Sequence, residues 1–127
     1  SLYTYDPLSR DYDELRLVKL QPRCSSSHIE IEIIHVPSSA PPAYEALSYV
    51  WGSSERTHNV IRIQPRHLSI SRNLSVALEH LRLRKKPRLL WIDAICINQD
   101  DIPERNQQVN KMGSIYSKAR RAVLWLG

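Results

Sequence analysis

Hydrophobic and polar residues alternate in two stretches near the start of the chain. Residues Glu14–Leu20 read ELRLVKL, and residues His28–Val36 read HIEIEIIHV. A period of two is typical of β-strands that bury one face and expose the other to water. The intervening segment 21–27 has a suitable length for a hairpin loop. The pattern therefore predicts an N-terminal antiparallel β-hairpin.

A proline-rich segment, residues 37–42, follows this hairpin and divides the chain. We expect residues 1–43 to form an extension made of the hairpin and this linker. Residues 44–127 would then form the core of the domain. A chain of 127 residues suits a single compact domain, so the two parts are expected to fold together.

Beyond the linker, short apolar stretches alternate with segments of helical periodicity. The expected strands are Tyr44–Val50, Asn59–Gln64, Leu68–Ile70, Arg88–Ile92 and Ala122–Leu126. The expected helices run from Arg72 to about Arg84 and from about Pro103 to Lys118. Strands and helices in this alternation predict an α/β fold with a mostly parallel sheet flanked by helices.

Local signals support both helices. Ser71 is a suitable N-cap for the first helix. In the second, Asp101 and Glu104 have the spacing of a capping box. An apolar stripe along the second helix should face the core; it comprises Val109, Met112, Tyr116 and Ala119.

The chain is basic, with a formal net charge of +5, and much of the excess lies in segments 82–88 and 118–121. Both segments lie at expected helix exits, where cations complement the helix dipole. A surface for nucleic acid or anionic membrane is the alternative. No aromatic platform or nucleic-acid motif accompanies the cations, so nucleic acid is not favoured as a partner.

Composition also limits the compartment and the chemistry. No apolar run is long enough to span a membrane, and the polar, acidic segment 1–14 does not resemble a signal peptide. We therefore expect a cytoplasmic protein. Cys24 and Cys96 are far apart and form no CxxC motif, so two reduced thiols are expected. The five histidines lack metal-ligand spacing, so no metal site is expected.

Polar residues follow the expected strand Arg88–Ile92 and form the first candidate ligand site. In open α/β sheets, ligands bind outside the carboxyl ends of the strands. Asp93, Asn98 and Gln99 could hold a ribose or an amide there. Alternatively, Asp93 and Asn98 cap the loop through hydrogen bonds to the backbone.

Five further residues are candidates with their own alternatives. Trp51 and Gly52 follow the first core strand and could form a pocket wall, or the tryptophan could plug the end of the sheet. Arg105 could bind a phosphate at a helix N-terminus or pair with a nearby aspartate. Glu104 is a weak candidate for a catalytic carboxylate beside its capping role. Cys96 lacks an evident base, which favours a buried structural thiol over a nucleophile.

Two blocks of sequence carry a resemblance to a known family. Residues 44–52 read YEALSYVWG and residues 90–99 read LWIDAICINQ, and further spaced matches run to the final WLG. Together they resemble the signature of the fungal heterokaryon incompatibility (HET) domain over Tyr44–Gly127. The resemblance implies an effector of self/non-self recognition that triggers programmed cell death. It also implies a distant relation to TIR domains and their flavodoxin-like fold.

The TIR relation implies NAD as a possible substrate, with no cofactor required. In TIR domains, the catalytic glutamate lies on a helix after the third core strand, a position that would fall beyond Gly127. We therefore expect the chain to be a shortened domain that does not turn over NAD. The alternative to catalysis is an interaction module that signals by self-association or with another cell-death protein.

Overall fold

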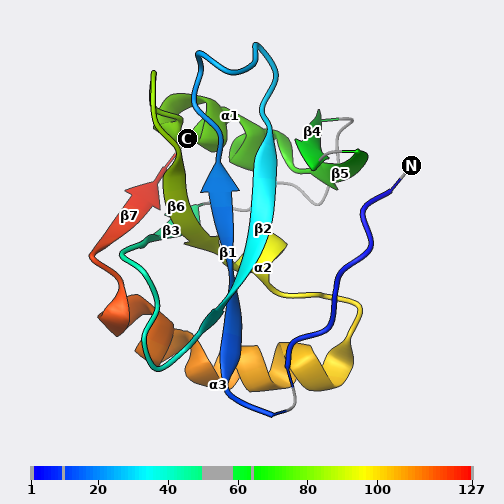
Figure 1. The fold of residues 1–127 in the computed structure, drawn as a ribbon, viewed down its shortest axis with the longest axis vertical. Helices are drawn as coiled ribbons and strands as arrows, with labels where there is room; N and C mark the ends of the chain where they lie inside the picture. The colour runs from blue at the N-terminus through cyan, green and yellow to red at the C-terminus, as the bar shows by residue number, and fades with distance from the viewer. Residues whose placement is uncertain (1, 10, 50–58, 64, 127) are drawn as a thin grey trace.

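The computed structural model describes residues 2–9, 11–49, 59–63 and 65–126 (Figure 1). Its strands are β1 (Glu14–Leu20), β2 (Ile31–Pro37), β3 (Glu45–Tyr49), β4 (Asn59–Ile63), β5 (Arg66–Ile70), β6 (Arg88–Ile92) and β7 (Arg121–Trp125). Its helices are α1 (Arg72–Leu81), α2 (Asp93–Cys96) and α3 (Ile102–Lys118). None of the described helices is both long and apolar enough to span a membrane.

Five strands form one mixed sheet in the order β2-β1-β6-β3-β7. β1 is antiparallel to both β2 and β6, whereas β3 is parallel to both β6 and β7. The predicted α/β fold and its N-terminal hairpin are confirmed, but the sheet is mixed rather than mostly parallel, with two antiparallel and two parallel pairings. From the βαβ pattern, the segments containing Leu47, Leu90 and Val123 are predicted to be neighbouring parallel strands, and this is confirmed. The parallel half of the sheet comes from the helical crossovers, and the antiparallel half comes from the hairpin.

The parallel strands have a flavodoxin-like arrangement. β3, the first of them in the chain, lies between the second and the third, β6 and β7. Adjacent residues of a strand point to opposite faces. Ser48 of β3 shares a hydrogen bond of 2.8 Å with Tyr116 of α3, whereas Tyr49 bonds to Ser71, the N-cap of α1. α1 and α3 therefore cover opposite faces, as in a doubly wound sheet.

β1 differs from the expectation of one buried and one wet face, which was wrong. Leu15, Arg16, Leu17 and Val18 are all almost fully buried, so both faces of the strand are covered. β1 lies between β2 and β6 inside the sheet, and α2 and the start of α3 cover the face that carries Arg16. Its sequence alternates because Glu14 and Arg16 are polar, although both are buried.

The inward face of α3 also differs from the expected stripe. Val109 is 54% exposed, so its predicted place in the core was wrong. Met112, Tyr116 and Ala119 do pack against the core, but the deepest positions are Gln108 and Ile115. In the first half of α3 the buried residues are thus polar, and a search for apolar periodicity does not detect them.

Several strand bounds differ from the expected ones by one to three residues, as at the starts of β2 and β5, and two helical features differ as well. α1 ends at Leu81 because Arg82 takes up an extended conformation. The expected loop 93–101 contains α2, a helix of four residues that is too short to show periodicity. The strands expected at 59–64 and 68–70 are present as β4 and β5, which pair in a separate two-stranded sheet.

Candidate functional site

The carboxyl ends of β3 and β6 define the first candidate site. In a doubly wound sheet, the crossovers leave to opposite faces at the first parallel strand, and ligands bind beside its carboxyl end. Here that end is Tyr49. The predicted pocket wall, Trp51 and Gly52, follows directly but lies outside the described residues.

Asp93 begins α2 immediately after β6 and lies close enough to Tyr49 for their charges to interact. Burial raises the pKa of Asp93, an effect partly offset by hydrogen bonds from its own amide and that of Ala94. Burial, together with the charge of Asp93, raises the pKa of Tyr49 to about 12. A tyrosine and a half-buried carboxylate therefore lie near one another at the carboxyl ends of two parallel strands.

Asn98 and Gln99 lie in the turn after α2, and their side chains bond to the backbone. The Asn98 Oδ1 atom accepts a hydrogen bond of 3.2 Å from the Asp100 amide. Gln99 Nε2 donates to the carbonyl oxygen of Asp93 at 3.0 Å. Asn98 thus caps the loop, in agreement with the second of the two interpretations. The prediction that the turn also contacts a ligand remains a prediction.

Glu104 forms a buried ion pair with Arg16 of β1. Arg16 Nη1 donates to Glu104 Oε2 at 2.9 Å, and Nη2 donates to Oε1 at 2.8 Å. The amide of Asn98 donates to Glu104 Oε2 at 2.7 Å. Arg16 is fully buried and Glu104 is 8% exposed. Both carboxylate oxygens are therefore engaged inside the protein.

The N-terminal segment completes the surroundings of Arg16. The guanidinium also donates to the carbonyl oxygens of Asp6 at 2.8 Å and Cys96 at 3.1 Å. It lies over the Tyr5 ring, 4.9 Å from the centroid, in a cation–π contact. Burial alone would lower the pKa of Arg16, but the hydrogen bonds and charge of Glu104 outweigh it and raise that pKa.

The start of α3 contains only half of the expected capping box. The Glu104 amide donates to Asp101 Oδ1 at 3.1 Å, as predicted for an N-cap. The Glu104 carboxylate does not complete the reciprocal bond, because it binds Arg16 and the Asn98 amide instead. Arg105 is exposed in the first turn of α3, and its predicted phosphate contact remains a prediction.

Cys96 is buried, and burial raises the pKa of its thiol to about 12. A thiol with so high a pKa is not a nucleophile at neutral pH. The described residues contain no group of three or more metal-ligating side chains. Arg16 is the residue that sequence reasoning missed. The only sign of it in the sequence is a cation between apolar residues, and the same pattern is typical of a strand with one face exposed to water.

The sequence profile described as "Heterokaryon incompatibility protein (HET)" matches residues 44–127. The chain therefore belongs to the HET family, as the resemblance indicated. A curated relative, "Heterokaryon incompatibility protein 6, OR allele" of Neurospora crassa, is 40% identical over 142 aligned positions. That match includes the whole of the chain but spans only 21% of the relative. No solved protein structure matches the chain significantly.

Proposed function

We propose that the chain is an effector domain of fungal heterokaryon incompatibility, the response to non-self after cell fusion, and that it triggers cell death. The observation that carries the proposal is the family match over residues 44–127. The 40% identity with the Neurospora protein extends the similarity through the N-terminal hairpin. That hairpin supplies Arg16, the partner of Glu104.

Two mechanisms fit this role. In the first, the complete domain cleaves NAD in the manner of TIR domains, at the carboxyl ends of the parallel strands near Tyr49 and Asp93. Cleavage requires a carboxylate that faces the ribose. Glu104 does not supply it in this chain, because Arg16 and the Asn98 amide occupy both of its oxygens.

In the second mechanism, the domain signals by self-association, and the β7 region favours it. Within the described residues, β7 is an edge strand that pairs only with β3. Leu124 of β7 is 67% exposed and Leu126, which follows, is 74% exposed. An exposed strand edge with apolar side chains is a template for association with another chain.

Conditional expression of the chain in a Neurospora strain tests the role. Growth arrest and death of the expressing compartments are expected, and Glu104→Ala, which leaves Arg16 unpaired, should abolish them. Normal growth despite accumulation of the folded wild-type chain would refute the proposal for this chain.

Incubation of the purified chain with NAD tests whether the chain itself has catalytic activity. No release of nicotinamide is expected. Release that disappears in Glu104→Ala while that variant remains folded by circular dichroism, but persists in Glu79→Ala, a change at an exposed carboxylate, would make Glu104 the catalytic group. In parallel, sedimentation should detect a self-associated form that Leu124→Asp disrupts. Val60→Asp, at an apolar residue 52% exposed on β4, is the matched control.

A further inference from the structure

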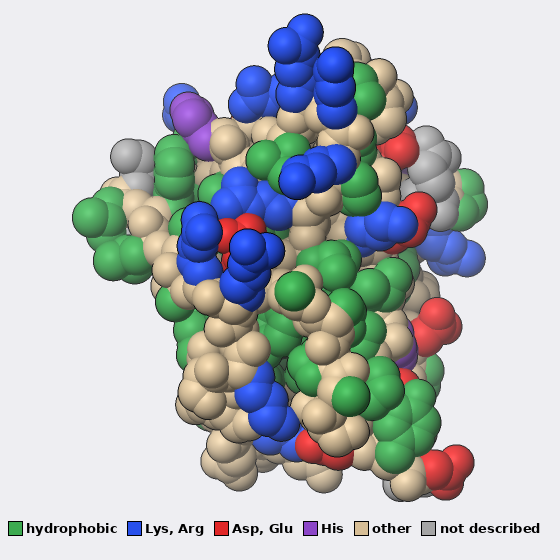
Figure 2. Space-filling view, turned by 60° about the vertical axis from the view of Figure 1, so that its left-hand side comes forward, with side chains coloured by type: hydrophobic (Ala, Val, Ile, Leu, Met, Phe, Trp, Pro, Cys, Tyr) green, Lys and Arg blue, Asp and Glu red, His purple; other side chains and the backbone are tan. Residues whose placement is uncertain are grey.

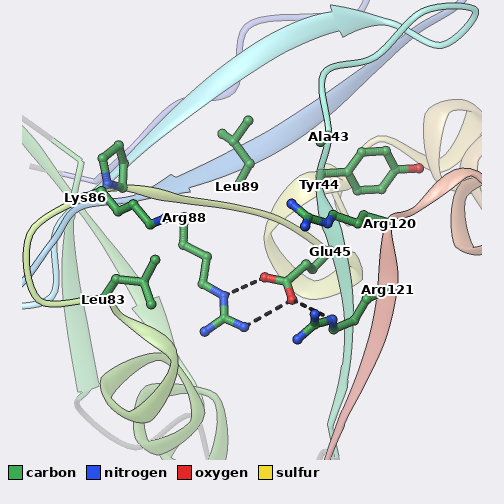
Figure 3. Close-up of a pocket in the computed structure, with 10 residues that line it drawn as sticks. Ala43, Tyr44, Glu45, Leu83, Lys86, Arg88, Leu89, Arg120 and Arg121 are labelled. Atoms are coloured by element: carbon green, nitrogen blue, oxygen red, sulfur yellow. Dashed lines mark hydrogen bonds and ion pairs between the residues drawn. The ribbon is translucent and has the colours of Figure 1, made fainter.

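The two basic segments of the sequence meet at one pocket, although they are more than thirty residues apart in the chain. Lys86 and Arg88 come from the first segment, and Arg120 and Arg121 come from the second. The pocket has a volume of about 340 Å³. Figure 2 shows lysine and arginine side chains gathered on one part of the surface, with an acidic side chain among them. The close-up in Figure 3 shows Arg88 and Arg121 joined to Glu45, with Arg120 nearby and Lys86 farther off, beyond Arg88.

This pocket lies at the end of the sheet opposite to Tyr49 and Asp93. Glu45, Arg88 and Arg121 are the first residues of the parallel strands β3, β6 and β7. The pocket is therefore formed by the amino ends of three adjacent strands, and it is separate from the candidate site at their carboxyl ends. Leu83 and Leu89 supply an apolar part of the lining.

Glu45 fixes two of the four cations. Its carboxylate accepts hydrogen bonds from Arg88 Nε at 2.6 Å and Nη2 at 3.1 Å, and it lies 3.6 Å from Arg121 Nε. The bond from Arg88 holds the pKa of Glu45 below its usual range despite burial, with help from the charges of Arg121 and Arg120. Arg88 Nη1 also donates to the Leu81 carbonyl oxygen at 2.8 Å. The guanidinium is thus held in place before any ligand arrives.

The other two cations, Lys86 and Arg120, form no ion pair among the described residues, although the charge of Arg120 acts on Glu45. The helix-end role expected for these segments holds for Arg88, which bonds to the last residue of α1, and for Lys118 in the last turn of α3. Lys118, in the last turn of α3, donates to the Ser38 carbonyl oxygen, and the buried Arg82 donates to the Pro22 carbonyl oxygen. Those two contacts account for Arg82 and Lys118. Of the other cations in the two segments, Lys86, Arg88, Arg120 and Arg121 line the pocket, whereas Arg84 and Lys85 do not.

We propose that this pocket binds a small molecule bearing two or more linked phosphate groups. Four cations and one carboxylate line the pocket, so its excess of positive charge is greater than a single phosphate neutralises. Guanidinium groups bind phosphate oxygens with paired hydrogen bonds, and Lys86 adds a further positive charge to the lining. The apolar side chains of Leu83 and Leu89 would contact the organic part of the ligand.

Calorimetric titration of the purified chain with inorganic pyrophosphate, and separately with inorganic phosphate, tests the assignment. Pyrophosphate should bind, and the double variant Lys86→Ala/Arg120→Ala should weaken that binding by about tenfold or more, because it removes two charged hydrogen-bond donors. The control, Arg84→Ala/Lys85→Ala, removes equal charge from the same loop outside the pocket lining. It should leave the affinity within about threefold of wild type.

Equal losses in the two double variants would show a diffuse basic surface and overturn the proposal. So would the absence of pyrophosphate binding, or phosphate binding that is equally tight. Vesicles of phosphatidylcholine with and without phosphatidylinositol bisphosphate distinguish the source of the phosphates. Vesicle binding that pyrophosphate displaces indicates a lipid headgroup. Pyrophosphate binding without vesicle binding indicates a soluble ligand.

Discussion

Replacing Glu104 with glutamine should strongly lower the free energy of unfolding, because it leaves the buried Arg16 without its charged partner. Arg16 is fully buried and both of its terminal nitrogens donate to the Glu104 carboxylate. The amide group of a glutamine would place hydrogen-bond donors against Arg16 or against the Asn98 amide. Breaking one side of a buried ion pair costs about 3–5 kcal/mol. That is a large share of the roughly 5–15 kcal/mol that stabilises an ordinary domain.

Urea unfolding followed by tryptophan fluorescence measures this cost. Glu104→Gln and Arg16→Met should each lower the free energy of unfolding by several kcal/mol, on the order of the penalty for an uncompensated buried charge. The double variant Arg16→Met/Glu104→Leu should lose less than the sum of the single losses, because no unpaired charge remains. Arg105→Gln, at the exposed neighbour, is the control and should change stability by less than about 0.5 kcal/mol. Losses below about 1 kcal/mol in both single variants, the size of an exposed ion pair, would refute the reasoning.

Three further predictions follow from buried polar groups. Gln108 is 1% exposed, and neither polar atom of its side-chain amide has a hydrogen-bond partner among the described residues. Gln108→Leu should therefore stabilise the protein by about 1–3 kcal/mol, measured by thermal unfolding. Gln107→Leu, at an exposed site, is the control and should not stabilise it in this way. Lower stability of the Gln108 variant would indicate an internal water or an unseen partner. A thiol reagent at pH 8 should label the exposed Cys24 but leave the buried Cys96 intact in the native state; rapid labelling of both would contradict the burial. Burial raises the pKa of Glu14, but hydrogen bonds from Tyr12, the Ser9 amide and His35 outweigh it, and the net pKa is lowered. Its contribution to stability is therefore present at neutral pH and lost as pH falls below about 4, so Glu14→Gln should be less stable than wild type at pH 7 but converge with it in acid. A difference independent of pH would contradict this.

Local patterns were sufficient to predict most elements of the fold. β1 and β6 occupy the ranges expected from their sequences, Glu14–Leu20 and Arg88–Ile92. Ser71 and Asp101 cap α1 and α3 as predicted, because an N-cap depends on residues within one turn. Strand alternation and helix caps act over a few residues, so a single sequence contains the information needed to recognise them.

Contacts between distant segments could not be predicted in the same way. Arg16 and Glu104 are 88 residues apart, and neither shows by its own neighbours that the other will lie beside it. The two basic segments around Lys86 and Arg120 likewise suggested helix ends when each was considered alone. Their meeting at one pocket could not be predicted, because it depends on the order of the parallel strands. α2 escaped recognition for a different reason: a single turn is too short to produce a periodic pattern.

The central place of β1 has a consequence for how the family's boundary is understood. The profile match begins at residue 44, yet β1 supplies the strand next to β6 and the counter-ion of Glu104. A chain cut at that boundary would expose the backbone edge of β6 and leave a buried carboxylate without its cation. The recognisable family segment is therefore smaller than the cooperative folding unit. A fusion or recombination event that moved residues 44–127 into a new protein would have to carry the hairpin with it or provide a substitute strand containing a well-placed arginine.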